Sequence, residues 1–115
     1  MTPAILRDTI QECWQTAEDH GFHSVKRTFG DACILITTEI VEAFESYRKN
    51  GRVVKYYFTP EGKPEGTGVE LADAVIRIFD VAVEECVLSA AQFAQTILTK
   101  MDYNKSRPYL HGKSM

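Results

Sequence analysis

Four carboxylates in this sequence stand in two pairs whose spacing suits a metal ion. Glu39 and Glu42 form one pair, Glu70 and Asp73 form the other, and residues 43–69 separate them. Side chains three residues apart on a helix are neighbours, about 5–6 Å apart at Cβ. If two antiparallel helices bring the pairs together, charges about 5 Å apart repel by about 3 kcal/mol at an effective dielectric constant of about 20. Such a cluster needs either protonation or a divalent cation.

The chemistry of these side chains selects the cation. All four candidate ligands are oxygen donors, and no histidine stands three or four residues from any of them. Sites made only of oxygen ligands favour Mg²⁺, with Mn²⁺ as a possible substitute, over Zn²⁺. The Glu-x-x-His motif of di-iron bundles is absent from the sequence, which argues against an iron oxidase or storage protein. The alternative is that the pairs belong to solvated helix faces and that Glu70 only caps a helix.

The elements that must position these residues are helices. Hydrophobic spacing and capping residues predict helices over residues 3–20, 31–49, 67–85 and 90–103, joined between the second and third by a long loop over 51–66. Asp31 is the expected N-cap of the second helix, Gly51 its stop, and Thr67 with Glu70 the capping box of the third. We therefore expect an all-α protein, a four-helix bundle that forms one domain over residues 1–115.

The helix expected over residues 67–85 is apolar nearly all round, which predicts burial on several sides. Its exception is a polar stripe at steps of three and four, formed by Glu70, Asp73, Arg77, Asp80 and Glu84. Arg77 and Asp80 either tune a metal site from the next turn or pair with each other inside the stripe, and the second interpretation is slightly favoured.

Composition narrows the class of protein. The 115 residues carry a net charge of −3, which gives no general basic surface for duplex nucleic acid. The sequence has neither an apolar run long enough to cross a membrane nor a secretory signal. Three cysteines without a paired CxxC spacing suggest reduced thiols, and we expect a cytoplasmic protein.

Cations that suit a phosphate follow in the last predicted helix and beyond it. Lys100 and Asn104 are four residues apart, and Arg107 can bind phosphate with two parallel hydrogen bonds. Mg²⁺ held by carboxylates commonly also binds phosphate oxygens of a substrate. The alternative is that Lys100 and Arg107 only complement the helix dipole.

The ordered combination of Glu39-x-x-Glu42 and Glu70-x-x-Asp73 resembles the metal-binding pattern of the MazG-like, all-α nucleoside triphosphate pyrophosphohydrolases. The strings at residues 39–48, 62–66, 69–80 and 100–112 also look like single-domain members, so the resemblance spans residues 32–112. It implies Mg²⁺-dependent hydrolysis of an NTP or dNTP to the monophosphate and pyrophosphate. It also implies a homodimer or homotetramer.

By this resemblance the metal ligands are Glu39, Glu42, Glu70 and Asp73, and the triphosphate contacts are Lys100, Asn104 and Arg107. Our hypothesis is that water activated by the metal attacks the α-phosphorus while Glu39 or Glu42 accepts its proton. Trp14, Phe22 and His23 are weak candidates for the base pocket; Trp14 fits the core better, and His23 fits the surface better.

Two other functions remain open at this point. One is a helical module that binds nucleotide or a protein partner without catalysis. The other is an enzyme that prefers diphosphates or a phosphoanhydride that is not a nucleotide, because ligands of the metal touch only phosphates.

Overall fold

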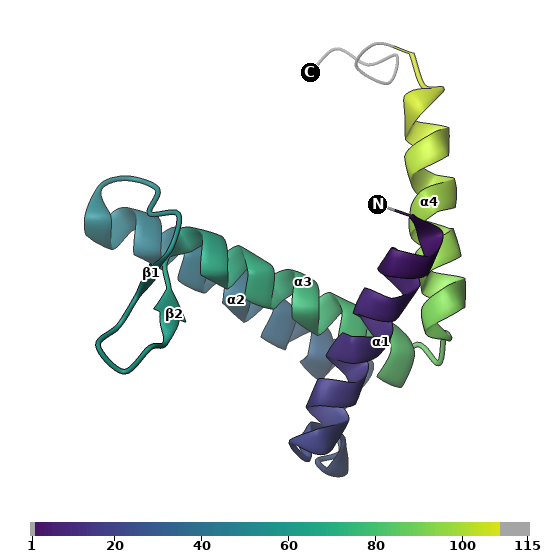
Figure 1. Ribbon diagram of the computed structural model, residues 1–115, viewed down its shortest axis with the longest axis horizontal. Helices are drawn as coiled ribbons and strands as arrows, with labels where there is room; N and C mark the ends of the chain where they lie inside the picture. The colour runs from purple at the N-terminus through teal and green to yellow at the C-terminus, as the bar shows by residue number, and fades with distance from the viewer. Residues whose placement is uncertain (1, 109–115) are drawn as a thin grey trace.

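The computed structural model describes residues 2–108, and residues 109–112, the end of the range that carries the resemblance, lie outside them. Four α-helices and one small hairpin make up this part of the chain (Figure 1). Their bounds are α1 Pro3–Asp19, α2 Phe29–Asn50, β1 Tyr57–Phe58, β2 Pro64–Glu65, α3 Thr67–Glu84 and α4 Ala90–Lys105, with a 3₁₀ turn, η1 Phe22–Ser24, after α1. This part of the chain is mostly helical, in agreement with the expected all-α class, and carries a small hairpin in addition.

Helix α2 begins earlier than the sequence predicted. Thr28 is its N-cap and Asp31 is the third helical residue, and the two form a reciprocal capping box. The prediction of Asp31 as N-cap was therefore wrong by one turn. At the other end Gly51 adopts a left-handed conformation with φ 67°, as the expected stop requires.

The segment between α2 and α3 is a hairpin and not a plain loop. β1 and β2 pair antiparallel, with Tyr57 opposite Glu65. Thr67 does not cap α3, contrary to prediction, because its hydroxyl accepts from the Val54 N–H and donates to Ser46. The hydroxyl thus ties the start of α3 to the hairpin segment and to α2.

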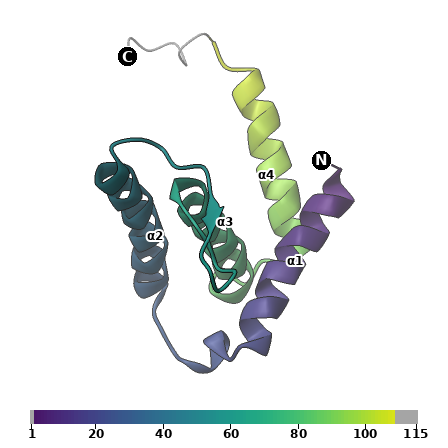
Figure 2. The same cartoon turned by 60° about the vertical axis from the view of Figure 1, so that its left-hand side comes forward.

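Helices α2 and α3 lie side by side and antiparallel, and α1 crosses α3 near its end (Figures 1 and 2). Helix α4 packs against α1 and extends away from the α2–α3 pair in both views. The buried core joins α1 to α4 through Leu6, Ile10, Ala90 and Ala94, with Phe79 of α3 packed against it. The four helices of one chain therefore share no single enclosed core, and the specific bundle type remains a proposal.

Large apolar side chains stay exposed along α2 and α3. On α2 they include Val41 and Phe44, at 51% and 57% exposure, and on α3 Leu71 and Val75, at 50% and 46%. The expectation that α3 is buried on several sides is wrong within this single chain. Among the described residues, no helix combines the length and the apolar character that a membrane span requires.

Candidate metal centre

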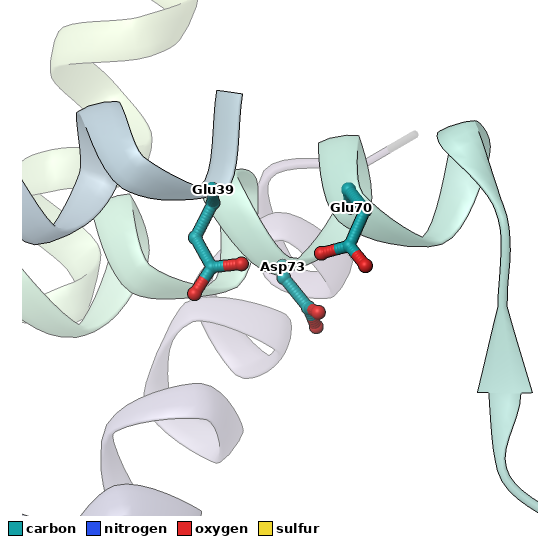
Figure 3. Close-up of side chains that lie close together, drawn as sticks. All are labelled: Glu39, Glu70 and Asp73. Carbon is teal, nitrogen blue, oxygen red and sulfur yellow. The ribbon is translucent and has the colours of Figure 1, made fainter. Parts of the chain in front are cut away.

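Three of the four predicted ligands meet between α2 and α3. Glu39 of α2 and Glu70 and Asp73 of α3 each place a carboxylate oxygen within 4.8 Å of the other two (Figure 3). We call these three residues the carboxylate cluster. Glu39 is buried, and the other two are half-buried. The antiparallel packing of the two helices thus brings three of the four predicted residues together.

The fourth predicted ligand, Glu42, lies beside the cluster and outside its tight group. Its side chain is near enough to Glu70 to raise the pKa of that residue through hydrogen bonding and charge, although Glu42 as a whole is exposed. Two carboxyl groups can share a hydrogen bond only when one of them is protonated. In the absence of a cation, Glu70 is the carboxyl group of this contact whose pKa is raised.

Proton affinity is raised within the cluster. Burial, the hydrogen bond with Glu42 and the neighbouring negative charges raise the pKa of Glu70 from 4.5 to about 7. Burial and the charge of Glu39 likewise raise the pKa of Asp73, against the opposing charges of Arg77 and Lys63. Unfavourable ionisation of this kind is what a bound divalent cation would relieve.

Arg77 supplies one positive charge to the cluster. Its Nε donates to Oε1 of Glu39 at 2.7 Å, and the two side chains are 39% and 10% exposed. The slightly favoured expectation that Arg77 pairs with Asp80 is therefore wrong, since Asp80 accepts a hydrogen bond from a different residue.

That residue is His23, whose Nε2 lies 2.6 Å from Asp80 Oδ1. The His23 side chain is only 5% exposed and stacks on Trp14, with ring centroids 5.3 Å apart. Burial lowers the pKa of His23, but the hydrogen bond and charge of Asp80, together with Glu18 and Glu84, raise it overall. The expectation of a surface histidine is wrong: His23 fastens the α1–α2 connection to α3.

The polar stripe on α3 thus has a different partner at almost every step. Glu70 and Asp73 face the cluster, Arg77 binds Glu39, Asp80 binds His23, and Glu84 accepts the Trp14 indole N–H at 3.0 Å. Trp14 is half-buried and hydrogen-bonded, so it is part of this polar contact as well as of the α1 packing.

Two hollows adjoin the carboxylates. The first, which we call the inner cavity, has a volume of about 230 Å³, and Glu39, Asp73 and Arg77 form its wall together with the apolar side chains of Phe22, Leu35 and Ile76. The second, which we call the polar groove, has a volume of about 310 Å³. Its wall holds one cation, Lys49, and four carboxylates, those of Glu42, Glu45, Glu65 and Glu70. The first hollow suits a flat, largely apolar group, and the second suits a cation.

The predicted phosphate contacts are not brought to the cluster within this chain. Lys100 and Asn104 lie on α4, and Arg107 follows its end, on the helix that extends away from α2 and α3 (Figure 2). Lys100 and Arg107 instead lie over the ring of Tyr103, at 4.9 Å and 5.7 Å from its centroid.

Sequence reasoning missed one cation near the cluster, Lys63 of the hairpin, whose charge acts on Asp73. For Arg77 it offered a role in tuning the metal site from the next turn, as the less favoured of two interpretations, and Arg77 does bind Glu39. The signal available for Arg77 was its position one turn after Asp73. No such signal identified Lys63, because only the hairpin fold brings it toward α3.

Comparisons of this chain with protein-family models, with curated proteins and with solved structures found no match.

Proposed function

We propose that this protein is a Mg²⁺-dependent hydrolase of nucleoside or deoxynucleoside triphosphates, with the monophosphate and pyrophosphate as products. The observation that carries the proposal is the carboxylate cluster: three acidic side chains from two helices within 4.8 Å, next to a cavity of about 230 Å³. The proposal takes the reaction itself from the resemblance of the motifs to MazG-like pyrophosphohydrolases.

The residues present fit a hard divalent cation. Glu39, Glu70 and Asp73 would hold it through oxygen atoms alone, and the raised pKa of Glu70 reflects a site short of positive charge. A bound Mg²⁺ would polarise the phosphate and lower the pKa of a water molecule. Metal binding would also displace the proton from Glu70.

The groups around the cluster would accept the proton and position the base and the phosphates. Glu39 is held by Arg77, whereas Glu42 stands outside the tight group and is exposed, so Glu42 is the better placed proton acceptor. The inner cavity would accept the nucleobase against Phe22. The polar groove holds four carboxylates against one lysine, so the outer phosphates would lie near it only together with bound Mg²⁺. This orientation places the phosphate nearest the nucleoside at the cluster.

The test is pyrophosphate release from the eight common NTPs and dNTPs in the presence of Mg²⁺. We expect turnover with at least one of them and loss of turnover in Asp73→Asn, with Glu61→Gln, an exposed hairpin residue, as the matched control. Release of orthophosphate only, or turnover with diphosphates alone, would refute the pyrophosphohydrolase assignment. Calorimetric binding of a nucleotide without any hydrolysis would favour the alternative of a non-catalytic module.

We further propose that the active form contains at least two copies of the chain. The exposed apolar faces of α2 and α3 form an unpaired surface of the kind that marks an interface between proteins. Because α4 extends away from the cluster, Lys100, Asn104 and Arg107 can contact the triphosphate only if a second copy brings its α4 to the carboxylates.

A complementation experiment tests this arrangement. Asp73→Asn and Arg107→Ala chains, each inactive alone, are unfolded together, refolded and assayed for pyrophosphate release. Recovery of about a quarter of the wild-type activity is expected, since random pairing makes half of the dimers mixed and each mixed dimer holds one intact site. A monomer by light scattering, or no recovery from mixed dimers, would contradict shared sites.

A further inference from the structure

Arg77 has more hydrogen-bonding capacity than its ion pair uses. A guanidinium group carries five N–H donors in a planar fork. The ion pair with Glu39 occupies Nε, at 2.7 Å. Over residues 2–108, no acceptor is recorded for the four terminal N–H groups, and the side chain is 39% exposed. The terminal part of the fork is therefore available to a ligand.

The position of this fork is specific. Arg77 forms part of the wall of the inner cavity, which it shares with Glu39 and Asp73 of the carboxylate cluster. It also borders an adjoining hollow lined by Phe22 and Leu35. A planar, charged donor lies where the apolar cavity meets the acidic groups, and Glu39 holds its Nε in place. This is the boundary that a nucleotide would cross between its base and its phosphates.

We infer that Arg77 is a substrate-binding residue, which uses its terminal N–H groups to bind the phosphate nearest the nucleoside. The inference rests on the proposed function and adds to it a contact between one residue, Arg77, and one particular phosphate of the substrate. Arginine binds phosphate through two parallel hydrogen bonds, which lysine cannot reproduce. The Glu39 contact fixes the plane of the fork, so that the arginine loses little freedom on binding.

Two substitutions separate binding from structure. In Arg77→Gln we expect KM for the best triphosphate to rise at least tenfold, and Arg77→Lys to recover only a small part of that loss. Affinity for the nucleoside monophosphate, measured by calorimetry with Mn²⁺ present, should fall by a similar factor. Affinity for pyrophosphate should change by less than threefold, because pyrophosphate lacks the phosphate that Arg77 contacts. Arg7→Gln, at an exposed arginine of α1, is the control.

The outcomes discriminate between the two roles. If Arg77 serves only as an ion pair, both variants lower the melting temperature while KM and monophosphate affinity stay within twofold of wild type, and the inference is overturned. Equal losses for pyrophosphate and monophosphate would also overturn it, since they would indicate a damaged metal site. If Arg77→Gln does not fold, Arg77→Lys gives the same two comparisons. If the wild type hydrolyses no nucleotide, the proposed function fails while the monophosphate measurement still decides the role of Arg77.

Discussion

Replacing Glu70 by glutamine should stabilise the protein in a chelator and, if the proposed function holds, remove nucleotide hydrolysis. In the absence of a cation, the negative charges of Glu42, Asp73 and Glu39, together with burial, disfavour ionisation of Glu70 and raise its pKa to about 7. Glutamine has nearly the same shape and carries no charge. The substitution therefore removes the repulsion and keeps the packing of α3 against α2.

The magnitude follows from the pKa. The difference between about 7 in the folded protein and 4.5 ordinarily corresponds to as much as about 3 kcal/mol. Because the folded state binds the proton more tightly, the folding free energy of the wild type becomes less favourable as pH rises from about 4.5 to 7. The gain in Glu70→Gln should thus be close to zero at pH 4.5 and complete at pH 8.

The assay is urea unfolding with a chelator at fixed protein concentration, at pH 4.5, 6 and 8. Glu12→Gln, which removes an exposed glutamate on α1, is the control and should change stability little at any of these values. The same series with millimolar Mg²⁺ should reverse the order at pH 8, because the wild type gains the free energy of metal binding and the variant loses a ligand.

Two results would refute this reasoning. An equal gain at pH 4.5 and pH 8 would mean that glutamine stabilises by some route other than charge. A loss of stability at pH 8 in the chelator would mean that the ionised carboxylate is favourably placed, and that the carboxylate cluster is not short of positive charge.

Three further substitutions test the elements that hold the site. His23→Gln should lower the free energy of unfolding by about 1–3 kcal/mol at pH 5.5 and by much less at pH 8.5, as measured by urea unfolding. The charged hydrogen bond from His23 to Asp80 is present below pH 6.5 and is lost as pH rises through the raised pKa of His23. Gly68→Ala should cost about 1–3 kcal/mol in thermal unfolding, since a Cβ there would lie 2.4 Å from the Lys55 carbonyl oxygen. Ile10→Ala, at a fully buried position, should cost about 2–5 kcal/mol and leave the affinity for Mn²⁺ unchanged.

Much of the helical framework was predictable, because its signals are local. Thr2 caps α1 and the Ser89–Gln92 box begins α4, each through contacts within a few residues. Gly51 ends α2 through its own left-handed conformation. The errors arose where two local signals compete. Thr28 and Asp31 stand three residues apart and both suit an N-cap, and only the reciprocal box decides between them.

Long-range partners were beyond the sequence pattern. The threonine at position 67 reads as a helix cap, but the Val54 N–H needs an acceptor once the hairpin folds back, and it takes that hydroxyl. The same holds for His23, whose burial depends on how the α1–α2 connection lies against α3. A spacing rule describes one helix. It carries no information on which other segment of the chain packs against that helix.

For the carboxylates, local spacing predicted that the two pairs meet if the helices pack antiparallel, and three of the four residues do meet. Residues three apart on each of two helices form two short rows, and antiparallel packing turns these rows toward each other, although Glu42 stays outside the tight group. The contacts of the cations could not be predicted from spacing in the same way. An arginine one turn away can reach along its own helix, across to the other helix, or into a cavity. Arg77 spans the last two, with Nε on Glu39 and the rest of its fork at the inner cavity. Arg77 therefore neutralises Glu39 through Nε and, under the proposed function, would bind the substrate through its terminal donors at the inner cavity.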